Sequence, residues 1–351
     1  TEPVPVWEAL EARSRLGIDL GGAGKAALVG RDRELDLLVD TLTRSRRERS
    51  TQLVTLVGVP GIGKSRLVHE LLRIVDEDDE LITWRQGRCL PYGEGVSYWA
   101  LGEIVKAQAG ILESDSADVA AAKLEDAVAR LPDEGERGWV ARHLRPLVGL
   151  GGGDLSGDQR GEAFAAWRRF VEALAEAGPA VLVFEDLHWA DDGLLDFVDH
   201  LVDWSSGVPI LVVCTSRPEL LERRPGWGGG KRSALTVSLS PLSDAETEQL
   251  LAALLAEKTV QNGRAARLLA HAGGNPLYAE EYVRMLAEPF AGPELPLPET
   301  VQGIIAARLD TLAAEEKALL QGAAVVGKVF WVGSLTAVSG RPRDEVEEGL
   351  L

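Results

Sequence analysis

The chain has 351 residues, a formal net charge of −18 and an ordinary hydrophobic fraction of 45%. This length allows two or three domains, each with a core of its own. The negative charge argues against a surface that grips the phosphate backbone of a nucleic acid. Because no apolar run is long enough to span a bilayer and no secretory signal opens the chain, we expect no membrane partner. The two cysteines, Cys89 and Cys214, fit a reducing cytoplasm, where we expect the protein.

Residues 1–27 are predicted to form a linker to a first domain, which we expect over residues 28–240. The segment Gly21-Gly22-Ala23-Gly24-Lys25 is typical of a flexible connection. It does not match a phosphate-binding loop, because it lacks the leading glycine and Ala26 stands where Ser or Thr is required. An amphipathic helix that begins near Leu35 is expected to open the folded part.

A strand predicted at about 52–57 leads into a loop with the pattern G-x-x-x-x-G-K-[ST], and a helical pattern follows it. In such a loop, glycines let backbone N–H groups curl around phosphate oxygens, and the helix adds its positive N-terminal end. Lys64 is expected to reach the β- and γ-phosphates, and the Ser65 hydroxyl to bind Mg²⁺. A Gly/Pro-rich turn before a helix is the alternative, but it leaves the coincidence of all four fixed positions unexplained. The sequence therefore predicts binding of a nucleoside triphosphate or diphosphate. The loop residues are Gly58, Val59, Pro60, Gly61, Ile62, Gly63, Lys64 and Ser65.

Further strands are expected after the loop, and a long helical region separates the first of them from the second. These strands are continuous apolar runs separated by helices, which favours a parallel sheet covered on both faces. An acidic run at 76–80 is interpreted as a solvated loop. The predicted strands cover residues 81–84, 180–184, 210–214 and 235–239, and the helical region covers 97–177.

Two acidic residues, Glu185 and Asp186, directly follow the strand at 180–184. One carboxylate at this position can orient the Mg²⁺ shell, and the other can polarise an attacking water. Because successive strand residues point to opposite sides, the two cannot have the same task. The usual order is Asp for the metal and then Glu for water, so the reversed order here leaves the assignment open. A polar cap at the strand end would explain one acid more easily than two.

The next strand ends in Thr215-Ser216-Arg217, where a polar side chain can contact the γ-phosphate or the attacking water. Arg217 could then report which nucleotide is bound, although a turn before Pro218 is the alternative. Between these strands, His188 is predicted to form a local hydrogen bond and Trp189 to pack.

From Pro241 onward the pattern is helical, and Ser243 with Glu246 forms a capping box. The chain stops within a helical pattern, so we expect a piece of a larger protein. Helices are predicted at about 245–256, 263–272 and 277–287, then, after a proline-rich hinge at 289–298, at 301–312 and 315–326.

Five segments in this order resemble the signal-transducing ATPases with numerous domains (STAND), a branch of the AAA+-related P-loop ATPases. They are LVGRDREL, GVPGIGKS, VLVFEDLHWADD, CTSRPE and AGGNPLYAEEYVRML. The sequence is most similar to bacterial members that follow a class III adenylate/guanylate cyclase domain or precede a LuxR-type helix-turn-helix. The resemblance covers about residues 28–340.

This resemblance implies an α/β P-loop NTPase fold. The expected architecture is a five-stranded parallel sheet in the order 5-1-4-3-2, covered by helices. An α-helical lid domain at 241–292 and a truncated winged-helix domain at 293–351 would follow it. The implied cofactors are ATP or ADP and Mg²⁺.

The resemblance also implies roles for individual residues. Gly58 to Arg66 would hold the phosphates, Glu185 and Asp186 would serve metal and water, and Arg217 would act as a sensor. Pro276 would close over the base from the lid. The residues placed beside the adenine and ribose are Val29, Gly30 and Arg31.

Two functional classes compete for this chain. In the first, the nucleotide controls a conformational switch with slow Mg²⁺-dependent hydrolysis, which acts on an effector domain in cis and involves self-assembly on activation. The second is a plain ATPase with efficient turnover. No second arginine has the pattern of an arginine finger, which favours the switch. A DNA-binding regulator that uses the winged helix is a third class, and the acidic charge argues against it.

Overall fold

The computed structural model describes residues 28–90, 97–151, 158–256, 272–287, 314–326 and 331–348. The chain divides into two compact units, Thr1–Ser240 and Pro241–Leu351. The predicted linker at 1–27, the hinge at 289–298 and the helix at 301–312 lie outside the described residues, as does nearly all of the helix predicted at 263–272.

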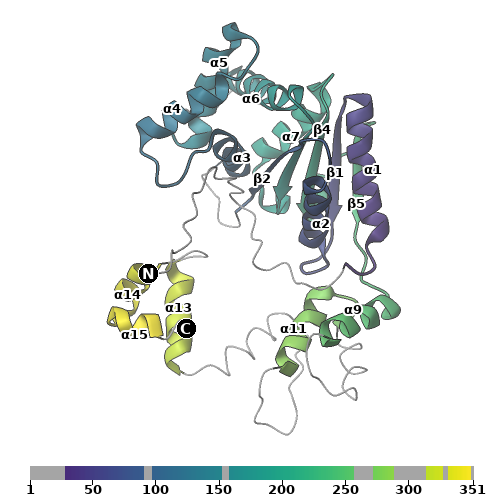
Figure 1. Cartoon of the computed structure of the whole chain (residues 1–351), viewed down its shortest axis with the longest axis vertical. Coiled ribbons are helices and arrows are strands. Elements are labelled where there is room, and N and C mark those ends of the chain that lie inside the picture. The colour runs from purple at the N-terminus through teal and green to yellow at the C-terminus, as the bar shows by residue number, and fades with distance from the viewer. Residues whose placement is uncertain are drawn as a thin grey trace, which may run out of the picture. The chain divides into compact units, whose positions relative to one another are not determined.

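The first unit is built on a five-stranded sheet with the order β2-β3-β4-β1-β5 (Figure 1). All neighbouring strands pair in parallel. The predicted order is therefore confirmed, since 5-1-4-3-2 is the same order taken from the other edge. The strands are β1 (Thr51–Val57), β2 (Thr83–Arg88), β3 (Ala180–Glu185), β4 (Ile210–Ser216) and β5 (Ala234–Ser238).

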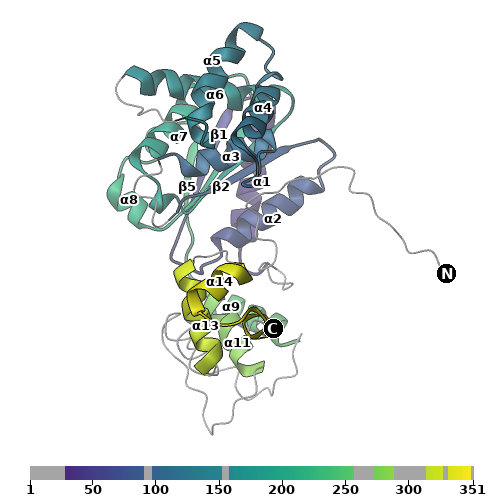
Figure 2. The ribbon, with the colours of Figure 1, turned by 90° about the vertical axis from the view of Figure 1, so that its left-hand side faces the viewer.

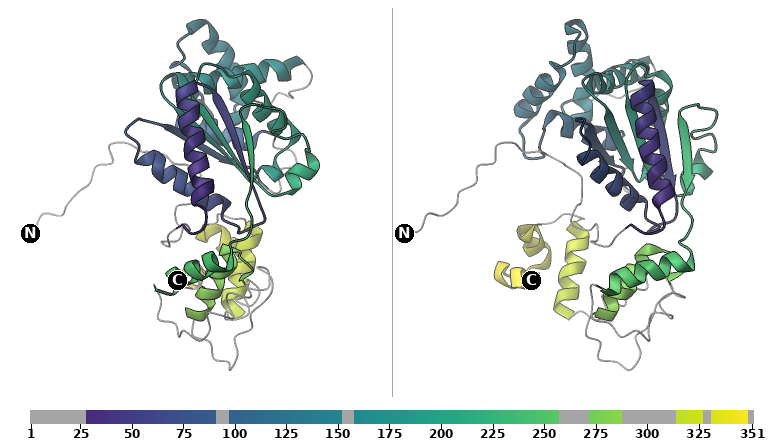
Figure 3. Two further views of the ribbon diagram at one scale, coloured as in Figure 1. Left: turned by 90° about the vertical axis from the view of Figure 1, so that its right-hand side faces the viewer. Right: turned by 45° about the vertical axis from the view of Figure 1, so that its right-hand side comes forward.

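Helices cover both faces of this sheet. Alternate residues of β3 enter different cores, because Leu182 and Phe184 point to one face and Val181 and Val183 to the other. One face carries α1 (Asp32–Glu48) and α2 (Lys64–Asp76), and α1 runs along the strands in Figure 3. The opposite face, toward the viewer in Figure 2, carries α3 (Trp99–Ala109), α6 (Asp158–Glu176) and α7 (Asp192–Trp204).

The long region between β2 and β3 is helical, as predicted. Its helices are interrupted near Pro132 and at Gly149, which has φ of +81° and ends the short helix η1. Asp133 caps α5, because its side chain accepts a hydrogen bond from the Gly135 N–H. Besides α3 and α6, the region contains α4 (Ala117–Val128), α5 (Glu134–Leu144) and η1 (Arg145–Val148).

Close contact between α3 and β2 depends on Gly87. A Cβ atom built on Gly87 would lie 2.0 Å from the carbonyl oxygen of Ala100, which belongs to helix backbone and cannot rotate away. We expect Gly87→Ala to destabilise the unit by about 1–3 kcal/mol, the usual effect of overpacking. The matched control is Gly161→Ala at an exposed position in the first turn of α6, where nothing lies within 4 Å of the added atom. The control should gain about 0.5–1 kcal/mol, and urea unfolding of both variants measures the difference.

The position of β2, the cover of β5 and the acidic run differ from the predictions. Pairing of β2 with β3 starts at Thr83, so the strand begins two residues later than predicted and leaves Leu81 exposed. The expected cover on both faces is wrong for β5, which lies at the sheet edge and is largely exposed. The acidic run is not simply solvated, because Arg46 binds Asp78 at 2.7 Å and Glu80 at 2.8 Å.

The second unit is helical in its described part. The predicted capping box is confirmed, since the Ser243 N–H donates to Glu246 Oε2 at 2.7 Å and the Glu246 N–H donates to Ser243 Oγ at 3.3 Å. The last three helices share a small core that includes Leu319 and Leu335. The assignment of 241–292 to a lid and 293–351 to a winged helix stays a prediction. The helices are α9 (Asp244–Ala256), α11 (Pro276–Ala287), α13 (Ala314–Val326), α14 (Val332–Ser339) and α15 (Arg343–Glu348).

None of the helices in the described ranges combines the length and the apolar character that a bilayer-spanning segment needs.

Candidate functional site

The glycine-rich loop connects the end of β1 to the start of α2 at Lys64. Gly61 and Gly63 have φ of +79° and +107°, values that side chains disfavour. A Cβ on Gly58 would lie 2.8 Å from Cγ2 of Ile62, so this approach also needs glycine. Gly63 is the N-cap of α2 and has no side chain to accept from the first N–H groups of the helix. The loop is therefore a backbone cradle that leads to a helix N-terminus, the geometry that binds anions.

Lys64 is buried within this cradle, with 9% of its surface exposed. Its Nζ donates to the carbonyl oxygens of Gly58 at 2.7 Å and Val59 at 3.1 Å. Burial lowers the pKa of Lys64, and the negative charge of Asp186 acts in the opposite direction. The loop thus encloses a cation whose hydrogen-bond partners are neutral carbonyl groups, a place where anionic oxygens are favourable.

The two acids at the end of β3 lie in different environments. Glu185 is buried, and its Oε2 accepts hydrogen bonds from Arg88 Nη2 at 2.7 Å and Nε at 3.0 Å. Asp186 has a left-handed backbone with φ of +55°, and its side chain is 41% exposed. Burial lowers the pKa of Lys64, and the negative charge of Asp186 opposes this shift. Glu185 is therefore held by an arginine of β2, whereas the Asp186 carboxylate lies close enough to the loop for its charge to affect the pKa of Lys64.

Arg88 is a residue of this site that the sequence reasoning missed. It stands opposite Glu185 in the parallel pairing of β2 with β3, and its Nε also lies 3.7 Å from Asp186 Oδ2. The signal that could have found it is a basic residue at the end of the strand that neighbours the paired acids.

The end of β4 connects β1 and β3. The Gly58 N–H donates to the carbonyl oxygen of Ser216 at 3.2 Å, and the Asp186 N–H donates to Thr215 Oγ1 at 3.1 Å. Arg217, the next residue, places its Cζ 5.8 Å from the centre of the Trp189 ring. Three strand ends thus bring the loop, the acids and this arginine to one edge of the sheet.

His188 and Trp189 differ from their predicted roles. They belong to the short helix η2 (Leu187–Trp189) that follows Asp186. His188 is 9% exposed, yet neither of its ring nitrogens has a hydrogen-bond partner among the described residues, so the predicted local bond is wrong. Burial lowers the pKa of His188, and the charge of Asp186 raises it. Trp189 is 44% exposed rather than packed.

Arg31, which precedes α1, forms a hydrogen bond to the glycine-rich loop. Its Nη2 donates to the carbonyl oxygens of Ile62 at 3.2 Å and Ser240 at 2.6 Å. Its Nη1 also donates to Glu34 Oε1 at 3.2 Å. Gly30 before it has φ of +66°. The guanidinium group therefore connects the loop to the chain just after β5, and the predicted contact of Val29, Gly30 and Arg31 with adenine and ribose stays a prediction.

The other predicted residues lie at three places. Ser65 is exposed in the first turn of α2, and Arg66 binds Glu70 of the same helix at 2.7 Å. Pro276 begins α11 in the second unit, and its role over the base stays a prediction.

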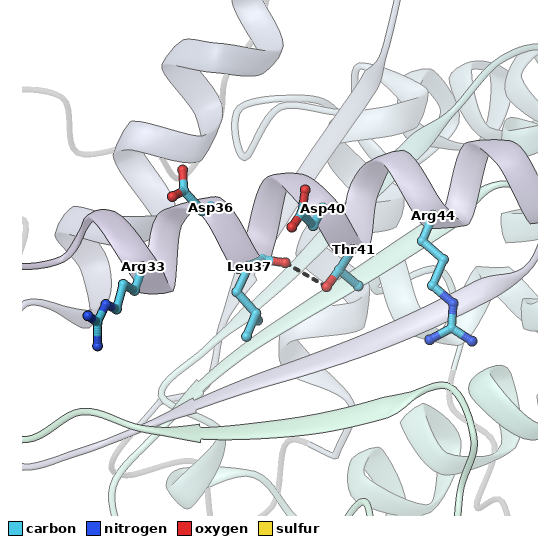
Figure 4. Close-up of a pocket in the computed structure, with 6 residues that line it drawn as sticks. All are labelled: Arg33, Asp36, Leu37, Asp40, Thr41 and Arg44. Carbon is cyan, nitrogen blue, oxygen red and sulfur yellow. Dashed lines mark hydrogen bonds between the residues drawn. The ribbon is translucent and has the colours of Figure 1, made fainter.

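A surface hollow on α1 is separate from this site. Figure 4 shows that its side chains come from α1, where the Thr41 hydroxyl donates to the Leu37 carbonyl oxygen at 2.7 Å. None of the six residues that line it is a predicted site residue. They are Arg33, Asp36, Leu37, Asp40, Thr41 and Arg44.

The comparison with protein families decides the class of this site. A family described as the AAA ATPase domain matches residues 27–213. The chain belongs to the AAA ATPase domain family. This match includes the glycine-rich loop, both acids at the end of β3 and most of β4.

A protein of Rhizobium meliloti (strain 1021), described as uncharacterized, is 27% identical to this AAA ATPase domain chain. The similarity covers 93% of the chain but 32% of that relative, so the chain spans about a third of the relative's length.

Solved structures similar to the chain include a STAND protein with a tetratricopeptide repeat sensor from Pyrococcus horikoshii. The two are 15% identical with a TM-score of 0.49, and the similarity covers 98% of this chain and 40% of that one. The Orc1 protein of Aeropyrum pernix, solved in complex with DNA, is 15% identical with a TM-score of 0.46. That similarity covers 92% of this chain and 82% of the other.

An AAA ATPase family member is expected to bind a nucleotide, and the residues present fit one. A side chain would clash at Gly58 and is disfavoured at Gly63 by its positive φ, and the cradle presents a helix N-terminus. Lys64 supplies a buried positive charge. The Ser65 hydroxyl and the Asp186 carboxylate are oxygen ligands of the kind that Mg²⁺ prefers.

Proposed function

We propose that the chain is an ATP- and ADP-binding regulatory module that acts as a nucleotide-dependent conformational switch and hydrolyses ATP slowly with Mg²⁺. Gly58 to Arg66 would hold the phosphates, and Lys64 would neutralise the β- and γ-phosphate charge. Ser65 and one of the two acids would hold Mg²⁺, which supplies further neutralisation of phosphate charge.

The environments of the two acids support a division of tasks. The exposed Asp186 carboxylate, which acts on Lys64, is the better candidate to serve the metal or the attacking water. Glu185 is already bound by Arg88. A carboxylate oxygen that already accepts two hydrogen bonds from an arginine is less available to a metal ion or a water, because its lone pairs are occupied. This supports slow turnover.

The observation that carries the switch proposal is the double hydrogen bond of Arg31. One guanidinium nitrogen binds Ile62 in the phosphate loop and Ser240, the last residue of the first unit. A change in the loop that moves the Ile62 carbonyl therefore changes the bonding of the chain segment that leads into the second unit. We propose that the nucleotide state passes to the second unit by this route.

The effector is proposed from the family resemblance. A cyclase domain or a helix-turn-helix in cis would be controlled by the module, with self-assembly on activation. The length of the Rhizobium meliloti relative supports further domains, since this chain covers 32% of it.

Two measurements on the purified chain test the proposal. Steady-state turnover is expected to be slower than about 1 s⁻¹, the low end of ordinary enzyme rates, and chromatography after denaturation should find retained ADP. Fast turnover without retained nucleotide would favour the plain ATPase instead.

Arg31→Ala is expected to uncouple the second unit from the nucleotide while the loop still binds it. In the wild type, hydrogen exchange of α9 and α11 should differ between the ATP and ADP forms, and in the variant this difference should shrink. ATP affinity should fall less than about tenfold, a loss of no more than about 1.4 kcal/mol. Arg33→Ala, two residues further along the chain on the surface of α1, is the matched control. If the ATP–ADP difference in hydrogen exchange were as large in the Arg31 variant as in the wild type, this route would be wrong.

A further inference from the structure

Trp189 is a large apolar side chain that stays nearly half exposed beside the phosphate site. It ends η2, three residues after Asp186, and its ring lies 5.0 Å from the His188 ring at an interplanar angle of 42°. A charged neighbour of the ring is Arg217, with Cζ 5.8 Å from the ring centre. This distance falls within the range of a cation–π contact.

The backbone of Arg217 is fixed, but its side chain has few restraints. Its carbonyl oxygen accepts from Ser216 Oγ at 3.1 Å and from the Leu220 N–H at 3.2 Å, at the start of the short helix α8 (Glu219–Arg223). Within the described ranges, its guanidinium group forms no ion pair with a carboxylate. Among the residues that the structure describes, the ring of Trp189 is therefore the contact that orients this long side chain.

A guanidinium group over an aromatic ring keeps its hydrogen-bonding capacity. The contact uses the flat face of the cation, whereas the five N–H donors point outward in its plane. In an ion pair with a carboxylate, some of these donors would be occupied. An arginine held by a ring is thus oriented and still free to bind phosphate oxygens.

We propose that Trp189 is a positioning residue that holds Arg217 ready for the terminal phosphate of ATP. This inference rests on the proposed nucleotide function and adds a specificity role to it. ADP lacks the phosphate that Arg217 would reach, so Trp189 favours ATP over ADP without contacting either nucleotide. This role requires the aromatic face of Trp189 and does not depend on the volume of the side chain.

The test compares an aliphatic with an aromatic replacement. Trp189→Leu removes the ring but keeps an apolar side chain, whereas Trp189→Phe keeps a ring. Titration with ATP·Mg²⁺ and with ADP·Mg²⁺ gives the ratio of the two affinities for each variant. We expect the leucine variant to lose about two- to fivefold in ATP affinity, the range of an exposed cation–π contact of 0.5–1 kcal/mol. ADP affinity should stay unchanged, and phenylalanine should restore at least half of the loss.

Trp204→Leu is the matched control, since Trp204 is also exposed, with 66% of its surface accessible, but lies at the end of α7 and contacts His200. This control should leave both affinities unchanged. A double-mutant cycle with Arg217→Ala adds the decisive comparison, because the leucine effect should disappear when the cation is absent.

Each outcome has a definite meaning. Equal ATP affinities for the leucine variant and the wild type would overturn the inference, as would equal losses in the leucine and phenylalanine variants. A leucine effect that persists without Arg217 would also overturn it. If the wild type bound neither nucleotide, the proposed function itself would fail, whereas in the other cases it stands.

Discussion

Lys64→Ala is expected to abolish the binding of ATP and ADP. The lysine is buried within the phosphate loop, and its ammonium group bonds to the neutral carbonyls of Gly58 and Val59. Without it, the cradle would have to enclose phosphate charge without its main counter-charge, because the nearby Asp186 is itself negative. The wild type should gain about 2.7 kcal/mol of stability at ~100 times the dissociation constant of the nucleotide, and the variant should gain none.

Thermal unfolding with and without ADP·Mg²⁺ measures this difference. Lys123→Ala is a suitable control, because this substitution removes the same charge at another position. Lys123 belongs to α4 and pairs with Asp115, just before that helix. Without nucleotide, the Lys64→Ala variant should remain folded, because Lys64 makes hydrogen bonds and no ion pair within the described part of the chain. Full ATP affinity in Lys64→Ala would contradict the assignment of the phosphate loop.

The phosphate loop and the parallel character of the sheet could be predicted because both depend on local patterns, whereas the strand order was implied by the family resemblance. The motif at Gly58 to Ser65 requires particular residues at particular positions, and the structure shows why at Gly58, where a Cβ would clash. The buried strands β1, β3 and β4 are continuous apolar runs, which only a sheet covered on both faces tolerates. Glu185 and Asp186 were found because two acids after four apolar residues are conspicuous.

The partners of the site residues could not be predicted, because they depend on register and on distant parts of the chain. The pairing of Arg88 with Glu185 requires the alignment of β2 with β3, which starts two residues later than the apolar pattern of 81–84 suggests. The contact of Arg31 with Ser240 joins residues 209 positions apart. The ring nitrogens of His188 have no hydrogen-bond partner among the described residues, and the local sequence does not distinguish such a histidine from one that forms a local hydrogen bond.

Asp186→Asn is expected to slow ATP hydrolysis far more than it weakens ATP binding. The asparagine keeps the shape of the side chain but removes the charge that can polarise water, and losses of this kind are about 10²–10⁴-fold. ATP affinity should fall less than about tenfold, since Lys64 and the loop backbone still hold the phosphates. Single-turnover hydrolysis and equilibrium binding of ATP separate the two effects.

Glu185→Gln is the matched comparison, because it makes the same chemical change at the neighbouring residue. Glu185 is buried and bound by the partly exposed Arg88, so removal of its charge should weaken this pair and lower the stability of the fold. Hydrolysis should change less than in the Asp186 variant, since the Glu185 oxygen that faces Arg88 is already engaged. A larger loss of hydrolysis in Glu185→Gln than in Asp186→Asn would reverse the two roles. In that case the ion pair between Arg88 and Glu185 would have to break when nucleotide binds, because Glu185 could act only after Arg88 released it.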